Sequence, residues 1–439
     1  MNRTKSGGGA DNEKGLETAV RDNRADRHCF SLPDRPSSSR PSDRKAVLRR
    51  TPDGGIRETM YLDVSGQAQW ISIYGEDKDN PVMLFLHGGP GESSGATDWV
   101  ILRKLAKDYT VVSWDQPGCG KTQIRDPQKA PVTPAFMRDA IDAVVNGVLD
   151  ETGKDRITIL GHSWGTMYGG DYVLRHPEKA DCLIDLSLSL DRDAVSMMQK
   201  GVEDYIACET DYQTAIDRYG CRAFLFYDFT DQSSCLHSRE DYSKFFEAIK
   251  QMLTDWTENS EEDRALADQF DPEQCTNLMC SGSETDAKKA MHVFGQSVLP
   301  LTDKYVYSSD ESLFDGDVNP LFAAFFNPYY SIADYVKIAF ADDDSYSQPV
   351  DPTDENSRDA CDVLLDEFDL GGKTEYAVPV YVLQGRDDNY CGVIQSYFDR
   401  IHAPDKELRY LDGGHMSTLI QSEQLAQFVH EIAGKRKNS

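Results

Sequence analysis

The stretch ITILGHSWGT, residues 157–166, predicts the fold of this chain. Four apolar or β-branched residues run into the pattern G-x-S-x-G, and a segment with helical spacing follows. Small residues at positions 161 and 165 let the backbone turn sharply, so that the hydroxyl of Ser163 stands clear of a sheet at the mouth of a helix. The positive end of the helix dipole favours negative charge that develops there. We therefore expect a strand, a tight turn and a helix, with Ser163 as a nucleophile.

Strand-like and helix-like segments alternate on both sides of this turn. We expect an opening hairpin, then strands at 81–87, 109–115 and 182–189, and helices at 98–107, 134–153 and 164–178. Strands that alternate with helices of this size are typical of a parallel sheet covered on both faces. The sequence therefore predicts an α/β fold with a doubly wound, mostly parallel sheet.

The alternation stops at Asp191 and resumes near Tyr376. The segment between them is acidic, tyrosine-rich and helix-leaning, which predicts a large, mainly helical cap over the sheet. Residues 1–52 are rich in Ser, Pro, Gly and Arg without apolar periodicity, which predicts a disordered tail. We divide the chain into the tail (1–52), the first part of the core (53–190), the cap or lid (191–375) and the second part of the core (376–439).

Composition excludes several classes of partner. The formal net charge of −29 argues against binding to nucleic acid or to an anionic membrane surface. The longest apolar runs are strand-sized, and the N-terminus has no apolar core of a secretory signal, so we expect a soluble, cytoplasmic protein. The ten cysteines include no C-x-x-C pair and no zinc-finger spacing, so we expect no metal and no cofactor.

A serine hydroxyl needs a base and an acid, and with this motif both follow the serine in the chain. The strand VPVYVLQ ends in the turn GRDD, where Asp388 is the expected acid and Asp387 the alternative. Among the downstream histidines, His415 follows a strand and two glycines (LDGGHM). His402 falls in a polar linker and His430 within the closing helix. We therefore expect His415 to be the base.

A second glycine-rich segment, LFLHGGPGESS at 84–94, lies upstream of the nucleophile. Glycines after a strand let backbone N–H groups point into a site, as an oxyanion hole requires. We expect the N–H groups of Gly89 and Trp164 to hold the oxyanion, and the imidazole of His87 to brace the loop from below.

The stretch SWDQPGCGKTQ at 113–123 ends like a phosphate-binding P-loop. The first glycine of that motif would stand at position 115, where this chain has Asp115. A carboxylate at this position disfavours phosphate, so a nucleotide hydrolase is not expected.

Five motifs in order, HGGPG, DQPGCGKT, GHSWGT, GRDDNYC and GGH, resemble the proline iminopeptidase branch of the α/β-hydrolase superfamily. The similarity covers about residues 55–190 and 376–430. It implies an α/β-hydrolase fold with a helical cap, a Ser163–Asp388–His415 triad and release of N-terminal proline from short peptides. It also implies that DQPGCGKT shapes the rim of the site, with Lys121 as a surface or ion-pairing residue.

Three functions remain in view. The first is an aminopeptidase that acts on short peptides, and the second is an esterase or amidase for small acyl compounds that shares the triad but not the amine anchor. The tryptophan–glutamate signature that carries part of that anchor in the family has no clear match in residues 191–375. The third is a hydrolase fold reused for ligand binding without turnover.

Overall fold

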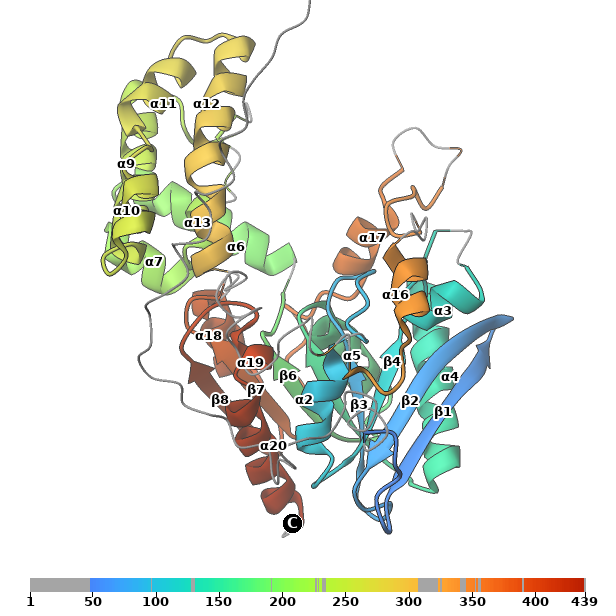
Figure 1. Cartoon of the computed structure of the whole chain (residues 1–439). Helices are drawn as coiled ribbons and strands as arrows, with labels where there is room; N and C mark the ends of the chain where they lie inside the picture. The colour runs from blue at the N-terminus through green and yellow to red at the C-terminus, as the bar shows by residue number, and fades with distance from the viewer. Residues whose placement is uncertain are drawn as a thin grey trace, which may run out of the picture. The chain divides into compact units, whose positions relative to one another are not determined.

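The computed structural model describes residues 48–437, apart from 96, 128–130, 191, 226, 228, 231–233, 307–322, 324–325, 340–344, 352, 354–356 and 389–390. The predicted disordered tail lies outside the described residues up to residue 47. Within them, eight strands form one sheet in the order β1-β2-β4-β3-β5-β6-β7-β8 (Figure 1).

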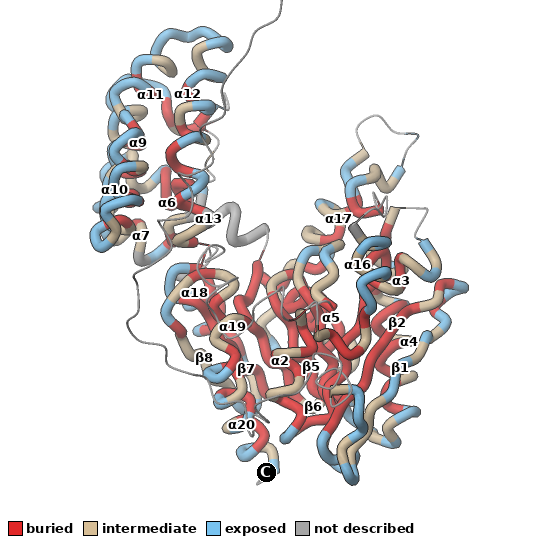
Figure 2. Tube along the Cα trace, in the orientation of Figure 1, coloured by how far each residue is buried: buried red, intermediate tan, exposed pale blue. Residues whose placement is uncertain are grey.

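The sheet is mostly parallel, as predicted. β1 (Ile56–Val64) and β2 (Gln67–Gly75) form the antiparallel hairpin, and β2 also pairs antiparallel with β4. All other neighbours are parallel: β3 (Val82–Leu86), β4 (Thr110–Asp115), β5 (Ile157–His162), β6 (Ala180–Leu186), β7 (Val380–Gly385) and β8 (Lys406–Leu411). The central strands are buried, whereas the outer strand β1 has exposed and partly buried residues along its length (Figure 2).

Helices cover both faces of the sheet, which makes the fold doubly wound. The apolar cluster on one face includes residues of α4 (Pro134–Thr152), α5 (Trp164–Arg175) and α18 (Cys391–Arg400). The cluster on the other face includes residues of α2 (Asp98–Leu105), α19 (Ser417–Ile420) and α20 (Ser422–Lys437). The segment 417–433, expected as one helix, is therefore two helices separated at Gln421, whose ψ of 54° leaves the helical region.

A long helical segment connects β6 to β7. Its helices are α6 (Arg192–Ile206), α7 (Tyr212–Tyr219), α8 (Arg222–Leu225), α9 (Arg239–Trp256), α10 (Glu261–Ala267), α11 (Pro272–Met279), α12 (Glu284–Ser297), α13 (Leu299–Tyr305), α16 (Ile332–Ala339) and α17 (Ala360–Glu367). Several of its phenylalanines, such as Phe245 and Phe246, are fully buried and contact one another edge to face. These rings pack the segment's own interior.

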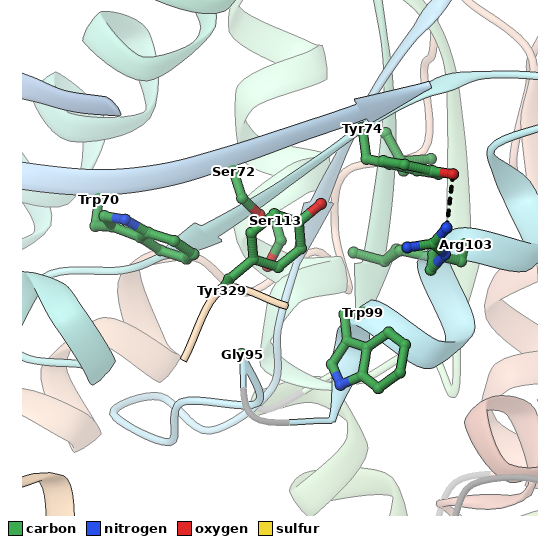
Figure 3. A pocket seen from close by; sticks show the side chains of 10 residues that line it. Trp70, Ser72, Tyr74, Gly95, Trp99, Arg103, Ser113 and Tyr329 are labelled. Carbon is green, nitrogen blue, oxygen red and sulfur yellow. Dashed lines mark hydrogen bonds between the residues drawn. The ribbon is translucent and has the colours of Figure 1, made fainter. Parts of the chain in front are cut away.

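Two features of the described residues bear on function. No described helix is both long and apolar enough to cross a bilayer. A cavity of about 20 Å³ lies between β2, β4 and α2, lined by Trp70, Ser72, Ser113 and Tyr329 among others (Figure 3). This volume holds about one water molecule, so the cavity is too small for a substrate.

Candidate active site

Ser163 occupies a strained position between β5 and α5. Its φ of 54° and ψ of −123° lie outside the regions that non-glycine residues normally adopt. Such a conformation costs on the order of 1–3 kcal/mol and persists where the surrounding structure enforces it. The N–H of Ser163 donates to Leu186 O at 3.1 Å, and its own carbonyl accepts from the N–H of Thr166 at 2.8 Å. The strand–turn–helix predicted from GHSWGT is confirmed.

The two glycines of the motif are required by close backbone contacts. A Cβ at Gly161 would overlap the carbonyl oxygen of Gly165, and a Cβ at Gly165 would overlap the carbonyl oxygen of Leu86 on β3. The turn therefore folds back on itself and presses against the neighbouring strand. The spacing G-x-S-x-G follows from these two contacts.

The glycine-rich loop after β3 passes directly beside Ser163. A Cβ at Gly88 would lie 3.2 Å from the Cβ of Ser163. Gly89, the next residue, has a φ of 119°, which glycine adopts without strain. On the other side of the serine, Trp164 is the first residue of α5, so its N–H has no acceptor within the helix. The two N–H groups predicted for an oxyanion hole thus lie in segments that flank the same side chain.

Asp388 and His415 meet through a hydrogen bond. The Nδ1 of His415 lies 2.9 Å from Oδ1 of Asp388, and the carboxylate is fully buried while the imidazole is 12% exposed. Gln384 donates from Nε2 to the other carboxylate oxygen at 2.7 Å. Asp387, the alternative acid, makes no hydrogen bond to His415; its N–H bonds to Gly413 O, and burial raises the pKa of its carboxyl.

The other downstream histidines lie in exposed ion pairs. His402 pairs with Glu375 at 2.8 Å, and both side chains are about three-quarters exposed. His430 pairs with Asp108 at 2.9 Å. Of the three downstream candidates, the structure therefore brings His415 to a buried aspartate. The hydroxyl of Ser163 makes no hydrogen bond to another described residue, and in hydrolases without substrate this contact is often long.

Two buried histidines surround the site without carrying charge. The ring of His162 lies 5.2 Å from that of His415, and burial together with the nearby imidazole lowers its pKa to about 3. Burial lowers the pKa of His87 to about 4. The Nε2 of His87 accepts from the N–H of Gln116, whose side chain accepts from the indole of Trp164. His87 therefore braces the glycine-rich loop, as predicted.

The turn DQPGCGKT forms an internal hydrogen-bond network at the same edge of the sheet. The buried carboxylate of Asp115 accepts from the N–H of Lys121 at 2.6 Å and from the hydroxyl of Tyr330. The ammonium of Lys121 donates to Tyr329 O at 2.5 Å, lies 3.7 Å from Asp334 and sits over the ring of Trp70. Lys121 is thus an ion-pairing residue that holds residues 329–334 against the core.

Sequence reasoning missed three polar residues around the site: Thr166, Ser187 and Gln384. Each is buried and hydrogen-bonded near Ser163, His415 or Asp388. A glutamine inside the apolar strand VYVLQG was the available signal for Gln384, because a buried amide needs partners. Among the described residues, no group of three or more His, Cys, Asp or Glu side chains could hold a metal ion.

Comparison with known proteins supports the α/β-hydrolase fold of this chain. Residues 81–204 match a family model described as the alpha/beta hydrolase fold. The chain is 31% identical over 118 residues to the "Probable aminopeptidase YbaC" of Bacillus subtilis, which is 27% of this chain and 37% of that protein. It is also 31% identical over 124 residues to a proline iminopeptidase of Heyndrickxia coagulans, covering 28% and 41% of the two chains. The matched segments thus span less than half the length of these two relatives.

Two solved structures align over most of the chain. The proline iminopeptidase-related protein of Thermus thermophilus aligns with a TM-score of 0.46 and 14% identity over 87% of this chain and 98% of that chain. The juvenile hormone epoxide hydrolase of the silkworm Bombyx mori aligns with a TM-score of 0.47 and 13% identity, over 90% and 81%.

Proposed function

We propose that this chain, an α/β-hydrolase-fold protein that resembles the proline iminopeptidase branch, is a serine hydrolase with Ser163, His415 and Asp388 as its triad. The observation that carries the proposal is the hydrogen bond of 2.9 Å between His415 and a fully buried Asp388, at the sheet edge where Ser163 stands on a strained turn. A buried carboxylate on Nδ1 fixes the tautomer that leaves Nε2 as the base.

The reaction proceeds in two steps. Ser163 Oγ attacks the carbonyl carbon of the substrate while His415 takes its proton, and the imidazolium is stabilised by Asp388. The N–H groups of Gly89 and Trp164 hold the oxyanion, and His415 returns the proton to the leaving group. Water, activated by the same imidazole, then releases the acyl group from Ser163. The low pKa of His162 keeps that neighbouring ring neutral, so no second cation competes for Asp388.

For the substrate, we propose short peptides with a free N-terminal residue, proline favoured. The partial relatives include proline iminopeptidases. In addition, a cavity of about 270 Å³ adjoins the glycine-rich loop and is lined by Pro90, Gly91, Glu92, Asp359 and Asp362 among others. None of these three carboxylates pairs with a cation among the described residues, so the groove suits a substrate ammonium.

The test compares three chromogenic substrates: a proline arylamide, the same compound with its nitrogen acylated, and a simple aryl ester. We expect hydrolysis of the free-amine arylamide to exceed that of the acylated one, because acylation removes the positive charge that the exposed carboxylates of the groove would attract. Equal rates on both arylamides, with fast ester cleavage, would instead indicate an esterase or amidase.

The nucleophile is tested separately with a fluorophosphonate probe. We expect the native protein to be labelled and Ser163→Ala not to be. A native protein that resists the probe and cleaves none of the three substrates would contradict the hydrolase proposal and favour a ligand-binding role.

A further inference from the structure

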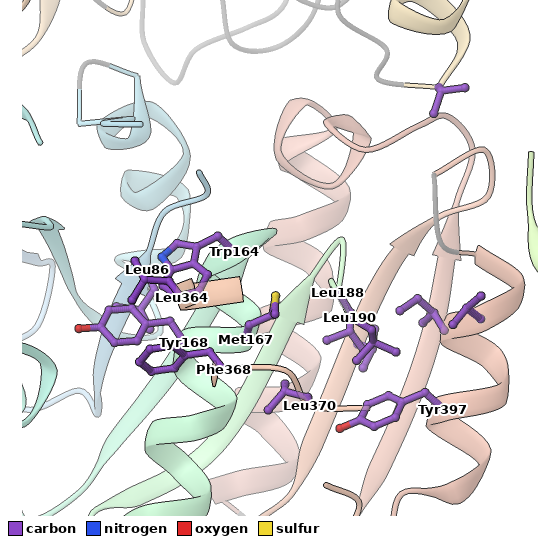
Figure 4. Close-up of a cluster of buried hydrophobic side chains, with 14 of the residues drawn as sticks. Leu86, Trp164, Met167, Tyr168, Leu188, Leu190, Leu364, Phe368, Leu370 and Tyr397 are labelled. Carbon is purple, nitrogen blue, oxygen red and sulfur yellow. The ribbon is translucent and has the colours of Figure 1, made fainter. Parts of the chain in front are cut away.

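The turn Ser187–Ser189 directly after β6 is linked by hydrogen bonds to each of the three proposed triad residues, either directly or through one other side chain. Ser187 and Leu188 are fully buried, and Ser187 has a φ of 50°, in the left-handed region. The N–H of Ser187 donates to Leu383 O on β7 at 2.9 Å, which ties the turn to the strand that leads to Asp388. The side chains of Leu188 and Leu190 belong to the apolar cluster that includes Met167 of α5 (Figure 4).

Ser187 holds the backbone of the base. Its hydroxyl donates to the carbonyl oxygen of His415 at 2.6 Å, and the hydroxyl of Thr418 lies 2.9 Å from the same Oγ. Because the Ser187 proton is used toward His415, Thr418 is the donor in the second bond. The loop that carries the imidazole is thereby fastened to the end of β6.

Leu188 holds the acid through Gln384. The N–H of Leu188 donates to Oε1 of Gln384 at 2.9 Å, and Nε2 of Gln384 donates to Oδ2 of Asp388 at 2.7 Å. The two bonds define which end of the amide faces the carboxylate. Gln384 thus holds the carboxylate through Oδ2, and Nδ1 of His415 lies 2.9 Å from Oδ1 and 3.1 Å from Oδ2.

Ser189 holds the nucleophile through Thr166. The N–H of Ser189 donates to Oγ1 of Thr166 at 3.0 Å, and this hydroxyl donates to the carbonyl oxygen of Ser163 at 2.6 Å. The strained serine is therefore linked to the same turn as the acid and the base.

We infer that the turn Ser187–Ser189 is the positioning element of the triad, acting on His415 through Ser187, on Asp388 through Gln384 and on Ser163 through Thr166. The inference rests on the proposed function. It assigns these residues no contact with substrate; they hold the three reacting groups in register. Loss of one link is expected to lower kcat with little change in KM, because a misplacement of about 1 Å costs about 100-fold in rate.

The first test removes one hydroxyl at a time. We expect Ser187→Ala and Thr166→Val to lower kcat by about tenfold or more at unchanged KM, and Thr166→Ser, which keeps the hydroxyl, to restore it. Thr158→Val is the matched control, because Thr158 is equally buried on β5 and its hydroxyl contacts Cys182 and Tyr109 instead of a triad residue.

The second test uses charge. Two ionisable groups contact the imidazole of His415: Asp388 after β7 and His162 at the end of β5. Gln384→Glu adds a carboxylate beside Asp388, and a second negative charge favours the imidazolium. We expect the acidic limb of the kcat/KM profile to move up by about one pH unit. Gln69→Glu, which alters an equally buried glutamine hydrogen-bonded to Trp114, is expected to leave the limb in place.

NMR signals of the His415 ring, followed against pH in native protein and in Gln384→Glu, give a readout that does not need turnover. Native protein without hydrolase activity would sink the proposed function, and the NMR comparison would still test the turn. Native kcat in Ser187→Ala and Thr166→Val, together with an unmoved His415 titration in Gln384→Glu, would overturn the inference.

Discussion

Two glycine-rich turns stand at the same edge of the sheet and differ in how they use their polar groups. The turn after β4 pairs every polar group that gives it a P-loop appearance: Asp115 with Lys121 and Tyr330, Lys121 with Tyr329, and Thr122 with the carbonyl of Asp115. The turn after β5 holds Ser163 at a positive φ, and its hydroxyl has no hydrogen bond to another described residue.

The contrast separates structure from chemistry. A satisfied hydrogen bond contributes about 1 kcal/mol to stability, whereas a strained backbone costs about as much or more. The turn after β4 therefore stabilises the fold, and the turn after β5 costs stability while it presents a hydroxyl. Changes in the first turn should alter stability, and changes in the second should alter rate.

The largest effect is expected from Ser163→Ala. Removing the nucleophile of a hydrolase lowers kcat by about a millionfold. Because the hydroxyl makes no hydrogen bond to a described residue, we expect the urea midpoint of unfolding to stay within experimental error of the native value. Aryl ester hydrolysis and urea unfolding on the same preparation measure both quantities. A Ser163→Ala variant that retains a tenth of the native rate would contradict the role of the turn after β5 in catalysis.

Gly165→Ala comes next. Its Cβ would overlap the carbonyl oxygen of Leu86, so α5 or β3 must move. We expect a loss of more than about 4 kcal/mol in the free energy of unfolding. Gly434→Ala is the control, because no atom would meet its Cβ in α20, and there alanine should stabilise the helix by about 0.5–1 kcal/mol. Native stability in Gly165→Ala would show that the turn is less tightly packed than described.

The carboxyl of Asp115 makes the stability contributed by the turn after β4 depend on pH. Burial raises the pKa of this carboxyl from 3.8 to about 6. The native state therefore holds the proton more tightly than the unfolded chain, so this contribution to stability is present below about pH 4 and is lost as the pH rises through about 6. We expect the stability difference between native protein and Asp115→Asn to change by up to about 3 kcal/mol across this range. Parallel pH profiles for the two proteins would contradict the assignment.

The smallest effect is expected from Lys121→Met. It removes the bond to Tyr329 O and the contact with the Trp70 ring, which together are worth about 1–2 kcal/mol. The rate should not change, and ATP should bind neither protein. Lys288→Met, at an exposed helix position, is the control. A loss of rate in Lys121→Met without a loss of stability would show that this turn contributes to the reaction and not only to the stability of the fold.

Much of the fold was predictable because its signals are local. Strand and helix patterns appear within single segments, and the contacts of Gly161 and Gly165 require small residues at a fixed spacing. The break between α19 and α20 at Gln421 carries no glycine or proline, so sequence pattern could not place it.

The site was less predictable wherever distant segments meet. The sequence favours Asp388 and leaves the adjacent Asp387 as an alternative, and only the folded structure shows that the carboxyl of Asp388 faces His415. Tyr330 bonds to Asp115 across 215 positions, and no motif announces that contact. Thr166 and Ser187 bond mainly to backbone groups, so any residue of similar shape and polarity could occur there without a recognisable pattern.

The helical segment leaves the sheet after β6 and re-enters it at β7. These two strands are hydrogen-bonded neighbours, with Leu183 paired to Val380 and Leu186 paired to Leu383. Because β6 and β7 are parallel, this segment leaves at the carboxyl end of β6 and re-enters at the amino end of β7, so its attachment points lie at opposite ends of neighbouring strands. A chimera that replaces residues 192–367 with the insertion of another protein of this fold must therefore keep a crossover connection along the strands and not only one strand spacing. Such a chimera would test whether the inserted helices set the selectivity of the proposed hydrolase while the sheet keeps the proposed triad.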